Sequence, residues 1–217
     1  MQALVSRRPR APFFIGPAMD EIVRQALAKW PNVPHCHGWL GLDARGDWYM
    51  RDDRAQAAGP FAGAASTQHS RGSRLRHDKL IGFIARNYEC DAHGQWFFQN
   101  GPQRVYVELE ATPWVWRIEG DPRVEGGVQS HTGLPTRAMA CLVDDAGRVY
   151  LQTPLGVGIV HSLDVVMVAD RVEAGELTLE EVTAEELPAR FGFVRSPSAE
   201  QKKAGLPTGL DSRAAQG

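Results

Sequence analysis

The chain has 217 residues, of which 43% are hydrophobic and 23% are charged, as in an average globular protein. This length suits one or two folded units, and no apolar run approaches the roughly 18 residues that a membrane-spanning helix needs. The net charge of −2 argues against bulk binding of nucleic acid. We therefore expect a cytoplasmic protein that does not bind a membrane and for which bulk binding of nucleic acid is not expected.

The N-terminal region is predicted to hold a flexible leader followed by a helix. Residues 1–17 are rich in proline and arginine, and their apolar part is too short for the core of a signal peptide. Apolar residues then recur at helical spacing over Asp20–Trp30, and Pro31 ends the pattern. We expect residues 18–90 to form an N-terminal α+β unit that begins with this helix.

His35, Cys36 and His37 are the strongest candidate for a metal cluster. On a strand the two histidines share one face and the cysteine points away, so at most two of the three could join one site. Zinc needs about four ligands, and the sequence offers no second cluster with suitable spacing. Cys90 and Cys141 are far apart in the sequence, so we expect three reduced thiols. The sequence therefore predicts no metal and no other cofactor.

Residues 52–72 are predicted to form a loop insertion, because they are rich in small residues and lack periodicity. A basic segment follows, with Arg71, Arg74 and Arg76 just ahead of a helix predicted over about His77–Tyr88. Helix N-termini carry free amides and partial positive charge, so these arginines favour a phosphate or a carboxylate as ligand. The alternative is a solvated basic junction, which is the commoner arrangement.

An internal match indicates a repeated β-hairpin unit. Asp91–Gln99 recurs as Asp144–Gln152, at an offset of 53 residues and without a gap. In each copy Asp-x-x-Gly supplies a turn, and aromatic or β-branched residues follow it. A third, shorter copy spans Asp43–Tyr49. We expect residues 91–117 and 144–170 to form superposable units that contain hairpins.

Aromatic and acidic residues on the predicted strands are further candidates. Trp114 and Trp116 share a strand face and could stack on a base or a ring, although such a cluster is more often part of a core. Glu108 and Glu110 also share a face and could act as acid and base, although alternate carboxylates usually mark the wet side of a sheet. The sequence lacks the motifs of serine hydrolases, P-loop proteins, dinucleotide-binding proteins and zinc proteases.

The end of the chain is predicted to contain a helix and a tail. Thr183–Glu186 has the spacing of a capping box, and Gly192 suits the end of the helix that would follow. We expect residues 91–195 to form a repeated β-rich unit. Residues 196–217 have almost no large apolar side chain and are predicted to be a disordered tail. Both ends of the chain are therefore expected to be removable without loss of the core.

Three stretches carry a resemblance to a known family: CHGWLGLDARGDWYM, LRHDKLIGFIARNYECDAHGQWFFQNGPQRVYVELEATPW, and the Gln-Thr-Pro of LQTPLGVGIV. Over residues 36–51 and 75–165 the chain resembles an uncharacterised proteobacterial family of unknown function. The resemblance implies a duplicated core, a C-terminal part similar to pleckstrin-homology-like barrels, a ligand or partner site at the domain interface, and a signalling role. It brings no catalytic residues. The insertion at 52–72 and the lack of a Gly-Leu-rich helix near the C-terminus depart from the family.

These patterns predict an α+β fold of repeated antiparallel β-hairpin units with a few helices. Residues 1–110 carry a net charge of +3 and residues 111–217 one of −5, which suits a polar cleft between the two halves. The first functional hypothesis is a non-enzymatic binding or regulatory protein, which holds a small anionic or nucleotide-like ligand, or a protein segment, between its halves. Its candidate binding residues are Arg71, Arg74, Arg76, Arg104, Trp114 and Trp116.

The second hypothesis is an enzyme of unrecognised type that uses histidine and glutamate residues at the same interface. Clustering of Arg74, Arg76 and Arg104 around a polar cleft would favour the binding protein. A histidine within hydrogen-bond reach of Glu108, at the base of a deep pocket, would favour the enzyme.

Overall fold

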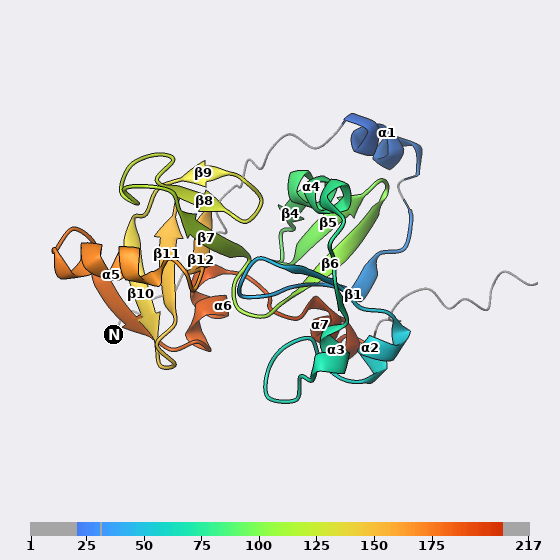
Figure 1. Cartoon of the computed structure of the whole chain (residues 1–217). Coiled ribbons are helices and arrows are strands. Elements are labelled where there is room, and N and C mark those ends of the chain that lie inside the picture. Colours follow the sequence, from blue (N-terminus) through green and yellow to red (C-terminus); the bar gives the residue numbers. More distant parts are fainter. Residues whose placement is uncertain (1–20, 31, 206–217) are drawn as a thin grey trace, which may run out of the picture.

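The computed structural model describes residues 21–30 and 32–205, which form two β-sheets with helices around them. Figure 1 shows the two sheets beside each other, with α4 (Asp78–Arg86) over the first and α5 (Val165–Glu173) on the outer side of the second. The predicted α+β class is confirmed. Each helix in this described part of the chain is too short or too polar to cross a bilayer.

The first sheet, which we call sheet A, has six strands in the order β3-β2-β1-β6-β5-β4. They are β1 (Cys36–Leu42), β2 (Trp48–Met50), β3 (Ser73–Arg74), β4 (Tyr88–Cys90), β5 (Trp96–Asn100) and β6 (Gln103–Leu109). β1 and β6 run parallel, and every other neighbouring pair is antiparallel. Two antiparallel groups of three strands are thus joined through β1 and β6.

The second sheet, sheet B, has seven strands in the order β13-β10-β11-β12-β7-β8-β9. They are β7 (Trp114–Ile118), β8 (Val128–Ser130), β9 (Pro135–Thr136), β10 (Ala140–Asp144), β11 (Val149–Thr153), β12 (Gly156–Val160) and β13 (Leu179–Val182). Here β7 and β12 run parallel, as β1 and β6 do in sheet A, and β13 adds to β10 in parallel. Apart from β13, the two sheets therefore have the same strand order and the same directions.

Sheet B is open, which corrects the barrel that the resemblance implies for the C-terminal part. β9 and β13 are its two end strands, and within the described residues each pairs with a single neighbour. The described chain therefore contains no closed barrel.

Three turns share one geometry. Asp43, Asp91 and Asp144 each place one carboxylate oxygen 2.8 to 3.0 Å from two backbone amides of the following residues. The glycine that closes each turn donates its amide to the aspartate carbonyl and has a φ between 75° and 85°, which L side chains rarely adopt. The turns predicted from Asp-x-x-Gly are confirmed.

The match at an offset of 53 residues holds for the strands and then ends. β5 and β11 coincide at this offset, and β4 and β6 overlap β10 and β12. Beyond them, β7 is a strand, whereas the matching residues lie in α5. β12 ends at Val160, and Asp164 is the residue before α5. The Asp164 carboxylate accepts hydrogen bonds from Ile118 N and Arg117 Nε. The expected superposition of 91–117 on 144–170 is therefore wrong beyond β6, and the interpretation as an internal repeat stays a prediction.

The two helices predicted in the first half are confirmed as α1 (Glu21–Lys29) and α4. The helix predicted near Gly192 is α6 (Glu186–Phe191), and Gly192 ends it with a φ of 68°. The proposed leader at residues 1–17 lies outside the described residues.

The predicted loop at 52–72 contains two short helices, α2 (Asp53–Ala57) and α3 (Gln68–Arg71). Side-chain caps start both: Asp52 accepts from Ala55 N, and Thr67 forms a capping box with Ser70. Between them, the Phe61 ring is buried against Gly41 of β1, where a Cβ would come 2.5 Å from the ring. The insertion therefore packs on sheet A.

The buried side chain of Arg51 holds this insertion through hydrogen bonds to backbone carbonyls. The side chain is 3% exposed, and its guanidinium donates to Ser70 O at 2.7 Å, Gly38 O at 3.0 Å and Gly59 O at 2.6 Å. These carbonyls belong to the middle of the insertion, to its C-terminal end and to β1. One buried cation thus satisfies three carbonyls that would otherwise lack donors.

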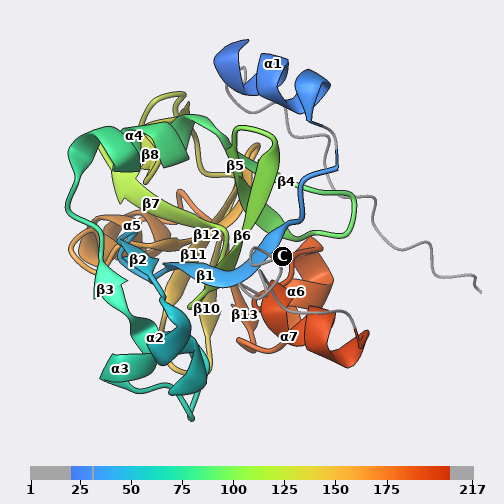
Figure 2. The same ribbon diagram turned by 90° about the vertical axis from the view of Figure 1, so that its right-hand side faces the viewer.

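The tail predicted from Ser196 onward is corrected at its start, because residues Pro197–Lys203 form α7. Ser196 caps this helix, and the buried Glu108 of β6 accepts from Ser196 Oγ at 2.5 Å and from Ser198 N at 3.0 Å. Figure 2 shows α7 beneath β1, and the helix contacts β1 and β6. The rest of the predicted tail, residues 206–217, lies outside the described residues.

The segment between α6 and α7 connects the two sheets. Val194 N donates to Gly94 O at 2.9 Å, and Leu109 N donates to Arg195 O at 2.8 Å. Arg195 also donates to Ala111 O at 3.2 Å. We call residues 192–196 the return strap, because they carry the chain from sheet B back to sheet A.

One buried apolar cluster runs through both sheets. Where they meet, Trp96 contacts Tyr88 at 4.8 Å and Trp114 at 5.0 Å between ring centres. The chain passes from one sheet to the other over residues 110–113, whereas the sequence predicts a division at 90/91. The division of the chain into structural units stays a prediction.

Candidate functional site

A hollow of about 330 Å³ lies where β3 leads into α4, and we call it the α4 pocket. It is lined by Gly46, Asp47, Trp48, Arg74, Leu75, Arg76, Asp78 and Ile81. Two of the arginines predicted to hold an anion, Arg74 and Arg76, are thus brought together. The volume falls at the lower end of the range of roughly 300 to 1,000 Å³ that is usual for small-molecule sites.

Strand pairing and a helix cap position this lining. β3 pairs antiparallel with β2, and just beyond the pair Leu75 N donates to Trp48 O at 2.8 Å. The chain then enters α4 at His77, whose Nδ1 accepts from Leu80 N at 3.2 Å. Arg76 therefore lies directly before the cap, at the end of α4 that carries partial positive charge.

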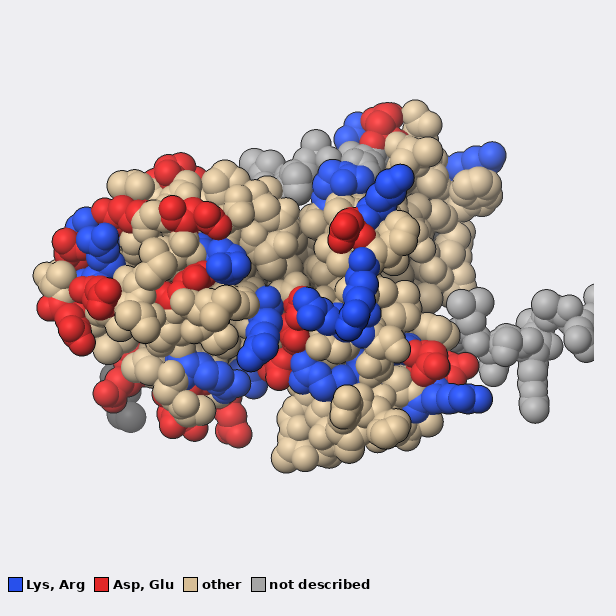
Figure 3. Space-filling view, in the orientation of Figure 1, with Lys and Arg blue, Asp and Glu red and all other residues tan. Residues whose placement is uncertain are grey.

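The pocket lining carries both signs of charge. Arg74 Nη2 lies 2.6 Å from Asp47 Oδ1. Burial and the nearby carboxylate of Asp43 raise the pKa of Asp47, and Arg74 opposes this shift. Arg76 and Asp78 are exposed, and neither makes an ion pair with any residue that the structure describes. Figure 3 shows Lys and Arg gathering along the middle of the molecule and over sheet A, while Asp and Glu gather on the sheet B side.

The α4 pocket borders sheet B through the turn after β1. A Cβ at Gly46 would lie 2.9 Å from the Cβ of His131 and 3.7 Å from that of Val115, and the φ of 85° also suits glycine. A side chain at this position would push the two sheets apart. The edge of the pocket is therefore in close contact with sheet B.

His131 occupies an aromatic box between the sheets. Its ring centre lies 5.5 Å from that of Trp48, 5.7 Å from that of Tyr88 and 5.8 Å from that of Trp114. Nδ1 accepts from Val115 N at 3.3 Å, and the buried Nε2 has no hydrogen-bond partner. Burial lowers the pKa of His131 to about 3. The imidazole is thus neutral in the folded protein at pH 7.

The burial of His131 predicts acid sensitivity. Between the usual pKa of 6.5 and the folded pKa of about 3, the unfolded chain binds one more proton, so stability falls as the pH drops through this window. We expect His131→Asn, which keeps an acceptor near Val115 N, to reduce the slope of the unfolding free energy by about 1.4 kcal/mol per pH unit. Urea unfolding between pH 4 and pH 7 measures this slope. Equal slopes in the wild type and the His131→Asn protein would refute the assignment.

Arg71 and Arg104 lie outside the α4 pocket. Both terminal nitrogens of the Arg71 guanidinium donate to the Glu110 carboxylate, at 3.0 and 2.9 Å. The guanidinium carbon lies 5.2 Å from the centre of the Tyr49 ring and 5.0 Å from that of the Phe61 ring. Arg104 stacks 4.5 Å over the Phe97 ring. The arginines predicted as one group are therefore divided among three places.

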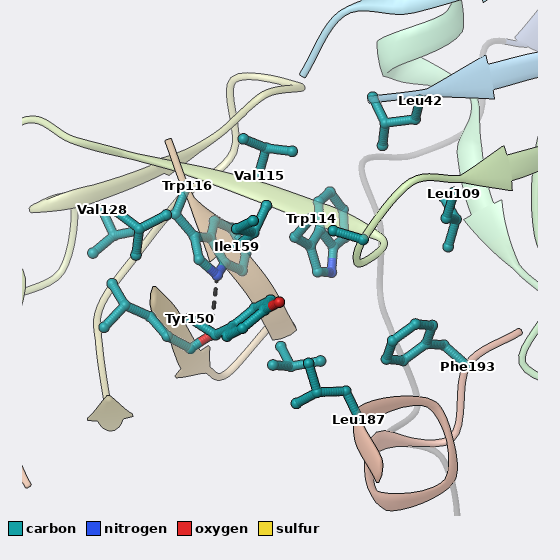
Figure 4. Close-up of a cluster of buried hydrophobic side chains, with 14 of the residues drawn as sticks. Leu42, Leu109, Trp114, Val115, Trp116, Val128, Tyr150, Ile159, Leu187 and Phe193 are labelled. Carbon is teal, nitrogen blue, oxygen red and sulfur yellow. Dashed lines mark hydrogen bonds between the residues drawn. The ribbon is translucent and has the colours of Figure 1, made fainter. Parts of the chain in front are cut away.

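Trp114 and Trp116 are part of the core. They are 1% and 0% exposed, and their indole N–H groups donate to Leu155 O and Leu151 O at 2.8 and 3.1 Å. Their rings stack at 5.7 Å, and Figure 4 shows them packed among the buried side chains of both sheets. Trp114 also lines a small pocket with Trp96, Leu155 and Phe193, and the binding role of the two tryptophans stays a prediction.

The two carboxylates considered for catalysis both have partners within the protein. Glu108 holds α7, as described above. Glu110 accepts from Arg71 and from Ala44 N, at 2.9 Å for the amide, and these bonds outweigh burial and lower the pKa of Glu110. Within the described residues, the hydrogen bonds of Glu108 lead to serines and not to a histidine.

The His35-Cys36-His37 cluster lies at the start of β1. His37 stacks on Tyr106 at 4.4 Å, while Cys36 is buried on the opposite face, as the strand alternation predicts. Burial and the neighbouring His35 lower the pKa of His37 to about 4. Among residues 21–30 and 32–205, no group of three or more His, Cys, Asp or Glu side chains is arranged for a metal ion.

The sequence reasoning missed the acidic part of the pocket, Asp47 and Asp78. Asp47 follows the third Asp-x-x-Gly turn and lies 27 residues before Arg74, with the insertion between them. Its local signal is that of a turn, and only the pairing of β2 with β3 brings it to the arginines. Asp78 has the usual signal of an acidic residue in a first helical turn.

Comparison with known proteins gives the following relations. The model of the family DUF2944, described as "Protein of unknown function (DUF2946)", matches residues 19–198. No curated protein matches the chain. A DUF1285 family protein from Shewanella baltica OS155 has 16% identity and a TM-score of 0.41, over 64% of this chain and 97% of the other. A DUF1285 family protein from Silicibacter pomeroyi DSS-3 has 13% identity and a TM-score of 0.42, over 74% of this chain and 80% of the other.

Proposed function

The chain belongs to the DUF2944 family of proteins of unknown function, and we propose that it is a non-enzymatic binding protein that holds a small anionic ligand in the α4 pocket. The observation that carries this proposal is the presence of Arg74 and Arg76 in one hollow at the start of a helix. Arginine presents a fork of N–H donors that suits phosphate and carboxylate, and the helix start adds free amides and partial positive charge.

The lining of the pocket supports binding over covalent catalysis. Its described residues include carboxylates and guanidinium groups, but no histidine, cysteine or serine. Nucleophilic catalysis usually needs such a group beside a base. The enzyme hypothesis placed histidine and glutamate at the interface, and there Glu108 is already held by α7.

The place of the pocket supports a regulatory role as part of this proposal. Its wall at Gly46 touches His131, which lies between the two sheets. A ligand that moves the turn after β1 would therefore change the fit of sheet A against sheet B. In this proposal the anion is a signal, and its binding changes the interface between the two sheets. A signalling role is what the resemblance of the sequence implies.

Replacement of Arg74 and Arg76 together by alanine tests the binding. We expect the affinity for inorganic phosphate, measured by titration calorimetry, to fall at least about tenfold, because charge-assisted bonds contribute about 1.5 to 3 kcal/mol each. The free energy of unfolding should change by less than about 1 kcal/mol, because the Arg74–Asp47 pair is at the surface.

The matched control is Arg137→Ala with Lys202→Ala, which also removes two exposed positive charges but none from the pocket. This control should keep the wild-type affinity at low and at moderate salt. Equal phosphate affinity in all three proteins, or no phosphate binding to the wild type, would reject the α4 pocket as an anion site.

A further inference from the structure

We propose that the ligand of the α4 pocket is amphoteric, with an anionic group and an ammonium group joined by a short carbon chain. This proposal rests on the proposed function and specifies the class of ligand. Aminoalkyl phosphates and amino acids have this chemistry.

The balance of charge in the lining carries the argument. Arg74 and Asp47 form a pair and largely neutralise each other. The remaining charged residues of the lining, Arg76 and Asp78, are opposite in sign, and neither forms an ion pair within the described part of the chain. A simple anion would satisfy Arg76 but would meet the like charge of Asp78. A ligand with both charges can pair with both residues.

The start of α4 carries the two charges that would meet the two ends of such a ligand. Arg76 precedes the cap of α4, where free amides also attract an anion. Asp78 is the first residue of α4 and lines the same hollow, so it is the group assigned to the ligand ammonium. Asp47 lies on the chain between the Asp43 turn and β2 and is already paired with Arg74.

The apolar residues of the lining favour a ligand that has a carbon chain between its two charged groups. Leu75 and Ile81 are half-buried, and Trp48 beneath them is 2% exposed. Such a surface gains from contact with methylene groups and gives nothing to a bare inorganic ion. Together with the limited volume, it favours a small metabolite over a free phosphate or a macromolecule.

Two probes that share the ethyl phosphate skeleton test the proposal: phosphoethanolamine, which carries the ammonium group, and ethyl phosphate, which lacks it. Near neutral pH ethyl phosphate has the larger net negative charge, so simple attraction to arginines would favour it. We expect titration calorimetry to show phosphoethanolamine binding at least about tenfold more tightly to the wild type, since each paired charge adds about 1.4 kcal/mol or more.

Variants then assign the preference to the acidic residues. Asp78→Asn should bring the ratio of the two affinities close to one without weakening ethyl phosphate. Asp170→Asn, an exposed residue on α5, should leave the ratio unchanged. The double variant Arg74→Ala, Arg76→Ala should lose both probes.

The outcomes separate this inference from the proposed function. Equal affinities in the wild type, or tighter binding of ethyl phosphate, would overturn the amphoteric ligand and leave the anion site in place. A preference that persists in Asp78→Asn would also overturn it. Failure of both probes to bind the wild type would overturn the anion site and this inference together.

Discussion

Ending the chain at Arg195 should lower the free energy of unfolding by about 2 to 4 kcal/mol. The truncation removes α7 and with it the two hydrogen bonds to the buried Glu108, and bonds to a charged group contribute about 1.5 to 3 kcal/mol each. It also exposes the surface covered by the buried Pro197. Urea unfolding followed by tryptophan fluorescence would report the loss, because tryptophans of both sheets lie in the shared core.

The matched control for this truncation ends at Gly205 and keeps all of α7. We expect it to unfold at the same urea concentration as the full chain, since every described contact of the helix is retained. A third protein, Glu108→Ala in the full chain, should lose about as much stability as the truncation at Arg195. If the two truncated proteins unfold at the same urea concentration, α7 contributes nothing to the stability of sheet A.

Replacing Arg51 by methionine should have the largest effect of any single substitution considered, a loss of about 3 to 5 kcal/mol. Methionine fills similar space but donates nothing, so the carbonyls of Ser70, Gly38 and Gly59 would be left without their donor in the interior. The insertion should then open locally, which limited proteolysis between residues 52 and 72 would detect before global unfolding.

Arg54→Met is the control for this substitution, because Arg54 lies in the same insertion and is exposed. We expect it to change stability by less than about 0.5 kcal/mol and to leave the protease pattern unchanged. Equal melting temperatures for the Arg51 and Arg54 variants would show that the three hydrogen bonds contribute little to the fold.

The parts of the fold that the sequence predicted are those with local causes. The Asp-x-x-Gly turns were predictable because the aspartate and the glycine act within a few residues of each other. The helices α1 and α4 follow from apolar spacing and flanking signals. The family of unknown function was recognised from the same short motifs, and it is confirmed.

The parts that it missed depend on distant partners. α7 looks polar and weak in isolation, and its stability comes from Glu108, which lies 88 residues earlier. The insertion lacks periodicity because it is held by hydrogen bonds of Arg51 and by the single buried ring of Phe61, and not by a regular hydrophobic face. The division at 90/91 stays a prediction, and the parallel pairing of β1 with β6, which places both halves of sheet A before residue 110, has no local signal in the sequence.

The candidate site was predictable only in part for the same reason. Arg74 and Arg76 are two residues apart and precede a helix, so their proximity can be inferred from the sequence. Arg104 and Arg71 have similar side chains but contact other partners, Phe97 and Glu110, that only the folded chain supplies. The burial of Trp114 and Trp116 depends on the contact between the two sheets, which periodicity does not reveal.

The return strap also bears on how the protein is made. Glu108 leaves the ribosome well ahead of Ser196, and at about 5 to 20 residues per second the intervening 88 residues take about 4 to 18 s to synthesise. Throughout that interval sheet A lacks the helix that covers β1 and β6. Sheet A, whose strands are translated first, is therefore completed only after all the strands of sheet B have been made.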